Sequence, residues 1–253
     1  MWRAFELVAG AGSGYAASVS ARLGAVLVAV AACGQADPAP AHRDPAAATV
    51  AVTEATPTLA APPAAASDDD LVDVLEVVPD VALDLRYATS DNITGAALYP
   101  VARCILRRAV AERLAVAARA VAAAGRRLCL WDCYRPFAAQ EELWRRKPDP
   151  RFVARPVREG GVPVSGSRHN RGAAVDVTLV SADGDPLPMP TGFDDFRPAA
   201  ARAAAHHAGG EAAANLGILE TAMVGAGFEA LASEWWHFDA PGWAQYPLGT
   251  AAP

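Results

Sequence analysis

Two clusters of acidic and imidazole side chains in the second half of the chain have residue types suited to metal chemistry. In the first, His169 lies in a polar segment bounded by glycines, and Asp176 lies inside an otherwise apolar stretch. A carboxylate buried without a partner is costly, and a cation is its simplest partner. Histidine with a carboxylate is a ligand combination typical of catalytic zinc, which takes three protein ligands and leaves one position open. An ion pair between Asp176 and an arginine is the alternative.

The second cluster, residues 234–238, reads Glu-Trp-Trp-His-Phe and supplies a third ligand and an acid. Strict β-alternation points residues three apart to opposite faces, so a bend or bulge is needed if Glu234 and His237 are to face one site. With His237 as the third ligand, Glu234 is free to act as general base on water. The alternative is an acid and a histidine on a half-exposed edge strand.

A third element places an arginine at the end of a strand. Residues 131–136 read Trp-Asp-Cys-Tyr-Arg-Pro, so Arg135 is followed by a proline, which cannot continue a sheet ladder. An arginine fixed at this point can stabilise the oxyanion of a tetrahedral intermediate. The residue type alone does not separate this role from that of a solvated arginine.

Helices and strands must bring these clusters together. Apolar patterning predicts strands over 71–78, 127–133, 173–179 and 228–238, and helices over 107–124, 137–146 and 211–225. Gly125 is expected to end the first helix, and the polar or proline-rich segments 88–95 and 148–163 are expected to be loops. Because helices and strands mix without regular alternation, we expect an α+β fold with one domain, whose small mixed or antiparallel sheet is flanked by helices.

Charge and hydropathy exclude two broad classes of protein. The 253 residues carry a formal net charge of −6, which leaves no basic surplus to neutralise a phosphate backbone, so we expect no nucleic-acid partner. The chain is 53% hydrophobic, but much of this is alanine, and one sustained apolar run near helix-spanning length lies close to the N-terminus. A polytopic membrane protein is excluded.

The N-terminal quarter has the pattern of an export signal and a tether. Arg22 precedes an apolar core that ends in Val30-Ala31-Ala32-Cys33, too short to span a membrane but typical of a bacterial lipoprotein signal in which Cys33 is lipidated. An ordinary cleaved signal peptide is the alternative. Residues 34–67 are rich in Ala and Pro and predict a disordered tether, so the folded domain is expected over 68–253. This predicts an exported protein whose only membrane contact is its N-terminal lipid, on the periplasmic or extracellular face.

The other three cysteines leave the disulfide pattern open. Cys129 and Cys133 lie on one predicted strand, roughly 13 Å apart by strand rise, which is too far for a bridge. Cys104 can pair with one of them in an oxidising compartment, which leaves an odd thiol. Three buried, reduced thiols are the alternative.

Four motifs together resemble the zinc D-alanyl-D-alanine dipeptidases of the VanX type. They occupy residues 84–95, 131–136, 167–179 and 234–238, in order from about Leu71 to the C-terminus. Two positions depart from the pattern: Cys133 replaces an expected glycine, and Asp195 beside Asp194 is a second candidate for the same carboxylate.

The resemblance implies roles for individual residues. One zinc ion per chain would be bound by His169, Asp176 and His237, with Glu234 as the base. Arg135 would stabilise the transition state. Substrate contacts would come from Ser167 and Asp194, with Tyr87 near the site.

The implied activity is hydrolysis of the dipeptide D-Ala-D-Ala to two D-Ala. An exported enzyme cannot act on a precursor made in the cytoplasm, so salvage or turnover of wall-derived dipeptide is the expected role. The enzymatic alternative is a related zinc carboxypeptidase or endopeptidase that acts on peptidoglycan stem peptides. An alternative from another class is a catalytically silent wall-binding module, whose signature would be the loss of Glu234 or of a ligand, and neither is lost.

Overall fold

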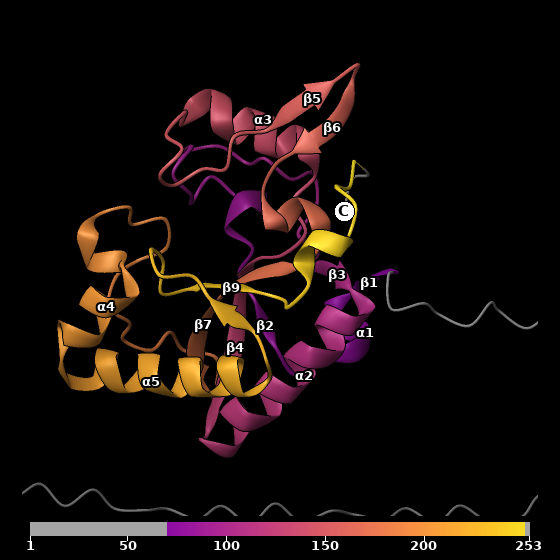
Figure 1. The fold of residues 1–253 in the computed structure, drawn as a ribbon. Helices are drawn as coiled ribbons and strands as arrows, with labels where there is room; N and C mark the ends of the chain where they lie inside the picture. The colour runs from indigo at the N-terminus through magenta and orange to yellow at the C-terminus, as the bar shows by residue number, and fades with distance from the viewer. Residues whose placement is uncertain (1–69, 251–253) are drawn as a thin grey trace, which may run out of the picture. The chain divides into compact units, whose positions relative to one another are not determined.

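The structure, a computed structural model, describes residues 70–250 (Figure 1). The predicted signal with Cys33, the whole predicted tether (34–67) and residues 68–69 of the predicted domain lie outside the described residues. Within 70–250, every helix is too short or too polar to cross a membrane.

The predicted α+β fold with a mixed sheet is confirmed. The central sheet has the order β2–β4–β7–β9–β8, and β2 is parallel to β4 while the other neighbours are antiparallel. Its strands are β2 Ala82–Leu83, β4 Arg126–Asp132, β7 Ala174–Ser181, β8 Glu229–Ala230 and β9 His237–Asp239. Two small antiparallel sheets pair β1 (Leu71–Asp73) with β3 (Ile105–Arg107), and β5 (Val157–Glu159) with β6 (Val162–Ser165).

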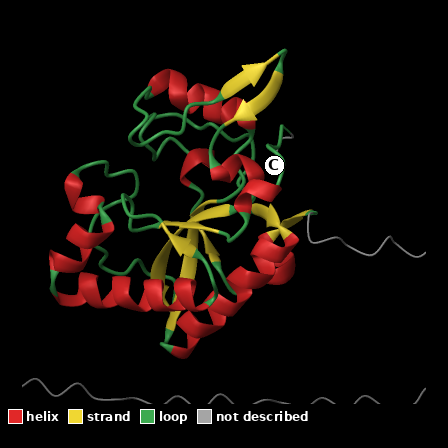
Figure 2. Cartoon of the chain, viewed as in Figure 1, coloured by secondary structure: helices red, strands yellow, loops and turns green. Residues whose placement is uncertain are grey.

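Five α-helices occur in the described chain (Figure 2). They are α1 Val74–Val77, α2 Arg108–Ala123, α3 Phe137–Arg146, α4 Arg202–Ala205 and α5 Gly210–Gly225. Short 3-10 helices are η1 Arg86–Ala88, η2 Arg168–Arg171, η3 Pro198–Ala200, η4 His206–Ala208 and η5 Trp243–Gln245. The long helices α2 and α5 contact each other and pack against β4 and β7. In Figures 1 and 2 they lie below the central sheet, whereas α3 and the β5–β6 hairpin lie above it.

Helix α2 shows how the sequence determines its element. Val110, Leu114, Ala117 and Val121 recur at helical spacing and are all buried, so one face of the helix enters the core. As predicted, the helix stops at Gly125, which has φ +72° and donates its N–H to the carbonyl of Ala122. Helix α3 occupies its predicted range.

Three predicted elements are wrong in part. The strand predicted over 71–78 ends at Asp73, because the Asp73 carboxylate accepts the N–H of Leu75 at 3.1 Å and caps α1. The strand predicted over 228–238 is interrupted by turns before β9. The loop predicted over 148–163 contains most of the β5–β6 hairpin, whose turn is formed by Gly160 and Gly161, both at positive φ.

The cysteines adopt one of the two patterns that the sequence left open. Cys104 and Cys133 form a disulfide, with their Cα atoms 5.3 Å apart. Cys129 is a buried free thiol on β4.

Candidate active site

One cavity of about 390 Å³ brings together the predicted site residues of the folded domain. Eight of them line it: Tyr87, Arg135, Ser167, His169, Asp176, Asp194, Glu234 and His237. They come from strands β7 and β9, from η1 and η2, and from the segments that follow β4, precede η3 and precede β9. The predicted lipidation site Cys33 lies outside the described residues.

Three buried side chains converge at the candidate metal site. The ladder pairs Asp176 of β7 directly with His237 of β9, and η2 delivers His169. The Asp176 Oδ1 atom lies 2.9 Å from His237 Nδ1 and 3.4 Å from His169 Nε2, and the two nitrogens are 3.2 Å apart. Each of the three side chains is less than one-tenth exposed.

These separations fit a single tetrahedral ion. Zinc bonds of 2.0–2.2 Å at tetrahedral angles place neighbouring ligand atoms about 3.3–3.6 Å apart. The three observed separations lie at or slightly below this range, and one carboxylate and two imidazoles form a ligand set that zinc favours. The three side chains can therefore hold a metal ion, as the sequence predicted.

Hydrogen bonds fix which nitrogen of each imidazole faces the other ligands. His169 donates from Nδ1 to the carbonyl of Cys133 at 2.8 Å, which leaves Nε2 directed to the site. His237 donates from Nε2 to Asp239 Oδ1 at 2.9 Å, which leaves Nδ1 directed to the site. Asp239 in turn accepts from Arg168 at 2.5 Å. Such outer partners orient metal ligands and raise their basicity.

The electrostatics of the three candidate ligands favour a cation between them. Burial on its own lowers the pKa of His237, but hydrogen bonds to Asp176 and Asp239 and their charges outweigh it and raise the pKa to about 10. Burial on its own raises the pKa of Asp176, but the neighbouring His169 and His237 hold the pKa well below its ordinary value. A proton on His237 thus occupies the position that a metal ion would take.

Glu234 lies in the turn before β9, so the bend that the sequence required is present. Its side chain lines the cavity, and burial raises its pKa to about 7, with a smaller opposing effect from His237. A carboxylate with a pKa near neutrality can both accept and release a proton.

Arg202, on α4, holds the turn that carries Glu234. Its guanidinium donates to the carbonyls of Leu231, Glu234 and His237 at 3.0–3.1 Å, and it pairs with Glu220 of α5 at 2.5 Å. It also stacks over the Phe238 ring, 4.6 Å from the ring centroid. One side chain therefore binds both ends of the segment from Glu234 to His237.

Arg135 is held rigidly at the edge of the cavity. Its guanidinium donates to Asp132 Oδ2 at 2.6 and 3.2 Å and to Gln140 at 2.8 Å, and it lies 4.7 Å from the Tyr87 ring centroid. Three of its five N–H groups are used in this way. Burial lowers its pKa, but the charge of Asp132 outweighs burial, so the pKa lies well above its ordinary value.

Asp194 and Tyr87 line the cavity beside Arg135. Tyr87 donates its hydroxyl to Asp194 at 3.0 Å, and Asp194 has φ +54°, a strained conformation for a residue with a side chain. Burial, followed by the charge of Asp176, raises the pKa of Asp194 to about 7. Asp195 instead pairs with Arg197 at 2.5 Å and is absent from the cavity wall, so of the two candidates Asp194 is the one that reaches the cavity. Ser167 lines the cavity and caps η2.

Sequence reasoning missed the supporting residues Asp132, Arg202 and Asp239. Asp132 stands within a motif that was singled out for its arginine, and Asp239 follows His237 at the spacing that places both on one face of a strand. Both signals were present in the sequence. No local pattern marks Arg202, because its partners are backbone carbonyls about thirty residues further along the chain.

Comparison with known proteins agrees with this geometry. The model of the peptidase M15 family described as D-ala-D-ala dipeptidase matches residues 67–249. The chain is 41% identical to the D-alanyl-D-alanine dipeptidase of Escherichia coli (strain K12) over 181 residues, which are 71% of this chain and 89% of that protein.

More distant relatives carry the same name. The chain is 36% identical to the D-alanyl-D-alanine dipeptidase of Enterococcus faecium, over 64% of this chain and 87% of that protein. It is 31% identical to the one from Streptomyces coelicolor, over 67% of this chain and 90% of that protein. With a family match over nearly all of the described residues, the chain belongs to the D-ala-D-ala dipeptidases of the M15 metallopeptidase family.

Proposed function

We propose that this protein is a zinc-dependent dipeptidase that hydrolyses D-Ala-D-Ala to two molecules of D-Ala. The observation that carries the proposal is the convergence of three donor atoms, each within 3.4 Å of the others, in the cavity that also contains Glu234 and Arg135. The names of the relatives at 31–41% identity support the substrate.

The metal would be held by His169 Nε2, Asp176 Oδ1 and His237 Nδ1, the atoms that the hydrogen bonds leave facing one another. Bound zinc supplies Lewis acidity and lowers the pKa of water towards neutrality. Asp239 and the carbonyl of Cys133 keep both imidazoles in the required tautomer.

The chemical steps fall to Glu234 and Arg135. Glu234 accepts a proton from the attacking water and delivers it to the amine that leaves, for which a pKa near 7 is well matched. Arg135 has two N–H groups beyond those bound to Asp132 and Gln140, and these are available to the oxyanion. Because Arg135 is already fixed by its partners, little reorganisation is needed when the charge develops.

The substrate's free ammonium would pair with Asp194, and Ser167 would bind a polar group of the dipeptide. The raised pKa of Asp194 reflects a buried carboxylate that a cationic ligand would stabilise. A related carboxypeptidase or endopeptidase would act on longer stem peptides, whose corresponding nitrogen is an uncharged amide. Asp194 therefore favours the dipeptidase over this alternative.

For location, we propose export and attachment through a lipid on Cys33. The Val30-Ala31-Ala32-Cys33 pattern supports it, and the Cys104–Cys133 disulfide is typical of oxidising compartments outside the cytoplasm. The role would then be salvage or turnover of wall-derived dipeptide. Cys33→Ser should move the protein from the membrane fraction to the soluble fraction, and identical fractionation of both forms would contradict the proposal.

Metal analysis combined with an assay on D-Ala-D-Ala tests the proposed function. We expect one zinc per chain, loss of hydrolysis after chelation, and recovery when zinc is returned. Full activity in a protein that elemental analysis shows to be free of metal would overturn the zinc mechanism. A zinc-loaded protein that cleaves stem pentapeptides as fast as the dipeptide would overturn the substrate.

A further inference from the structure

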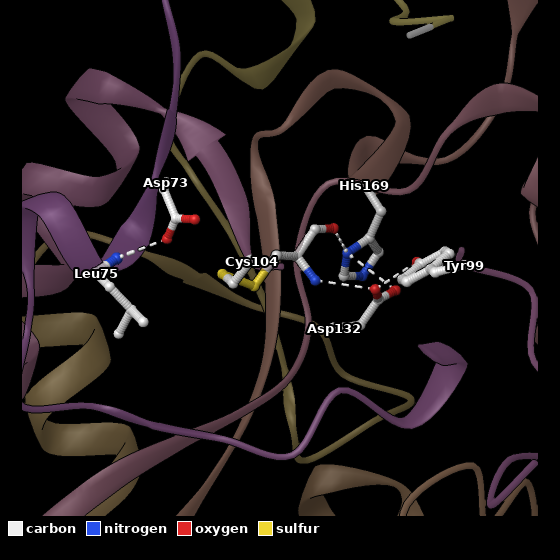
Figure 3. Close-up of a disulfide and its surroundings, with 7 residues drawn as sticks. Asp73, Leu75, Tyr99, Cys104, Asp132 and His169 are labelled. Atoms are coloured by element: carbon white, nitrogen blue, oxygen red, sulfur yellow. Dashed lines mark hydrogen bonds and ion pairs between the residues drawn. A yellow bond between two sulfur atoms is a disulfide. The ribbon is translucent and has the colours of Figure 1, made fainter. Parts of the chain in front are cut away.

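The Cys104–Cys133 disulfide lies next to the peptide segment that contacts the candidate ligand His169 (Figure 3). The carbonyl of Cys133 accepts the Nδ1–H of His169 at 2.8 Å, and the N–H of Cys133 donates to Asp132 Oδ1 at 2.9 Å. Asp132 is the carboxylate that holds the Arg135 guanidinium. A single peptide segment therefore orients a candidate metal ligand and the support of the candidate oxyanion residue.

The pairing of β4 with β7 does not by itself fix the segment that contains Cys133. The ladder between β4 and β7 changes register between Leu130 and Asp132, and β4 ends at Asp132. Beyond this point, two links tie the chain to the start of β3: the N–H of Tyr134 donates to the carbonyl of Ile105 at 2.9 Å, and Cys133 is bonded to Cys104. The disulfide is the covalent one of the two.

We propose that the Cys104–Cys133 disulfide is a positioning element of the active site, which holds the Cys133 carbonyl where it orients His169 for metal binding. The inference rests on the proposed zinc-dependent function. A carbonyl free to move by a few tenths of an ångström would weaken the hydrogen bond to Nδ1 and allow the imidazole to rotate. Outer partners of this kind contribute about 10- to 100-fold to metal affinity.

The chain offers a matched control in Cys129, the one cysteine of the folded domain that is outside the disulfide. Cys129 lies on β4, four residues before Cys133, and is also buried, but it forms no disulfide; burial raises the pKa of its thiol to about 11, so it stays protonated. Removing its sulfur tests the loss of a buried cysteine on β4 without loss of the cross-link. Val121→Ala in α2 serves as a second control, because it removes core volume away from the cavity.

The test compares zinc dissociation constants, measured by competition with a chromophoric chelator, for the full chain and for Cys104→Ala/Cys133→Ala. We expect the double variant to bind zinc about tenfold or more weakly at a temperature where circular dichroism shows it folded. Cys129→Ala and Val121→Ala should bind within about twofold of the parent protein, although Val121→Ala unfolds at a lower temperature.

A second measurement covers the case in which the double variant does not fold. The parent protein is reduced with a phosphine: the disulfide takes up two electrons and two protons to give two thiols, and the phosphine becomes its oxide with oxygen from water. After the phosphine is removed, the folded, reduced protein should show the same loss of zinc affinity, and reoxidation should restore it.

Equal zinc affinity of the oxidised protein and its folded, cross-link-free forms would overturn this inference and leave the proposed function intact. Absence of zinc binding by the oxidised parent protein would overturn both.

Discussion

At the scale of residues, the cavity separates the roles of its carboxylates by environment. Burial raises the pKa of Glu234 and of Asp194 to about 7, whereas two neighbouring imidazoles keep Asp176 ionised. In the proposed mechanism the same functional group would therefore serve as base, substrate partner and metal ligand. Which role each carboxylate takes follows from what surrounds it.

Replacing the base should remove turnover and keep the metal. Glu234→Gln preserves shape and leaves all three candidate ligands in place, so we expect zinc content near one per chain and kcat lowered about 10²- to 10⁴-fold. Elemental analysis and steady-state kinetics on D-Ala-D-Ala measure the two quantities. Loss of zinc from the variant would show that Glu234 is a ligand.

Removing the Asp194 carboxylate should abolish selection for a free ammonium. For Asp194→Asn we expect kcat/KM on D-Ala-D-Ala to fall and the preference over N-acetyl-D-Ala-D-Ala to shrink by a factor of 10 or more, since an unpaired buried charge costs several kcal/mol. Asp195→Asn is the matched control, because Asp195 pairs with Arg197 and does not line the cavity. If both variants show the same preference for D-Ala-D-Ala over N-acetyl-D-Ala-D-Ala, Asp194 does not bind the ammonium.

At the scale of elements, the turn before β9 is held by residues of α4 and α5. Arg202 binds three carbonyls of this segment and is itself held by Glu220. The helices that pack on the sheet therefore also set the position of Glu234.

Truncating Arg202 should lower the rate of catalysis although this residue does not line the cavity. Arg202→Met leaves three carbonyls without their donor, so we expect kcat to fall about 10- to 100-fold with a smaller change in KM, and the free energy of unfolding to drop by about 1–3 kcal/mol. Arg202→Lys, which keeps the charge, should recover part of kcat. Arg197→Met removes an exposed arginine and should leave both quantities unchanged. An unaltered kcat in Arg202→Met would show that the turn holds its own shape.

The sequence predicted elements whose signals are local. Helices α2 and α3 carry their own periodicity and end signals, and they lie within a residue of the predicted ranges. The strands predicted from the sequence are absent at 74–77 and at 232–236. There a capping aspartate, Asp73, and a distant arginine, Arg202, override the apolar pattern. The candidate site was predictable because motifs carry residue types and spacing. The pairing of Cys104 with Cys133 was not predictable from the sequence, because it depends on how β3 lies beside the end of β4.

At the scale of the whole described chain, the cavity concentrates ionisable groups whose pKa values change on folding. Glu234 and Asp194 have ordinary values of 4.5 and 3.8, both raised to about 7, and His237 rises from 6.5 to about 10. All three hold protons more tightly in the folded state. The stability that they contribute is complete below the ordinary values and is lost as the pH rises through the folded ones.

Metal-free protein should therefore lose stability as the pH rises from about 5 to about 9. Below about pH 7 most of this loss of stability comes from the carboxylates of Glu234 and Asp194, and above it most comes from His237. Thermal unfolding in the presence of a chelator measures the effect, and the double variant Glu234→Gln/Asp194→Asn should lose less between pH 5 and 7. A midpoint that rises over this range would contradict the predicted sign.

The disulfide adds stability on the same scale. It joins residues 29 positions apart, and a loop of that length corresponds to about 3–4 kcal/mol in the chain-entropy model. This is a large fraction of the stability of an ordinary domain. Its loss therefore affects both the fold and, by our proposal, the site.

The position of β9 in the central sheet links the assembly of the candidate site to the completion of synthesis. His237 pairs with Asp176 from a strand that follows all the other strands of the described chain. A polypeptide that emerges N-terminus first presents His169 and Asp176 before the third candidate ligand, His237, and Glu234, which follow about sixty residues later. An unfinished chain therefore has no complete set of candidate ligands. If these residues bind the metal, hydrolysis can begin only after this last strand has docked beside β7.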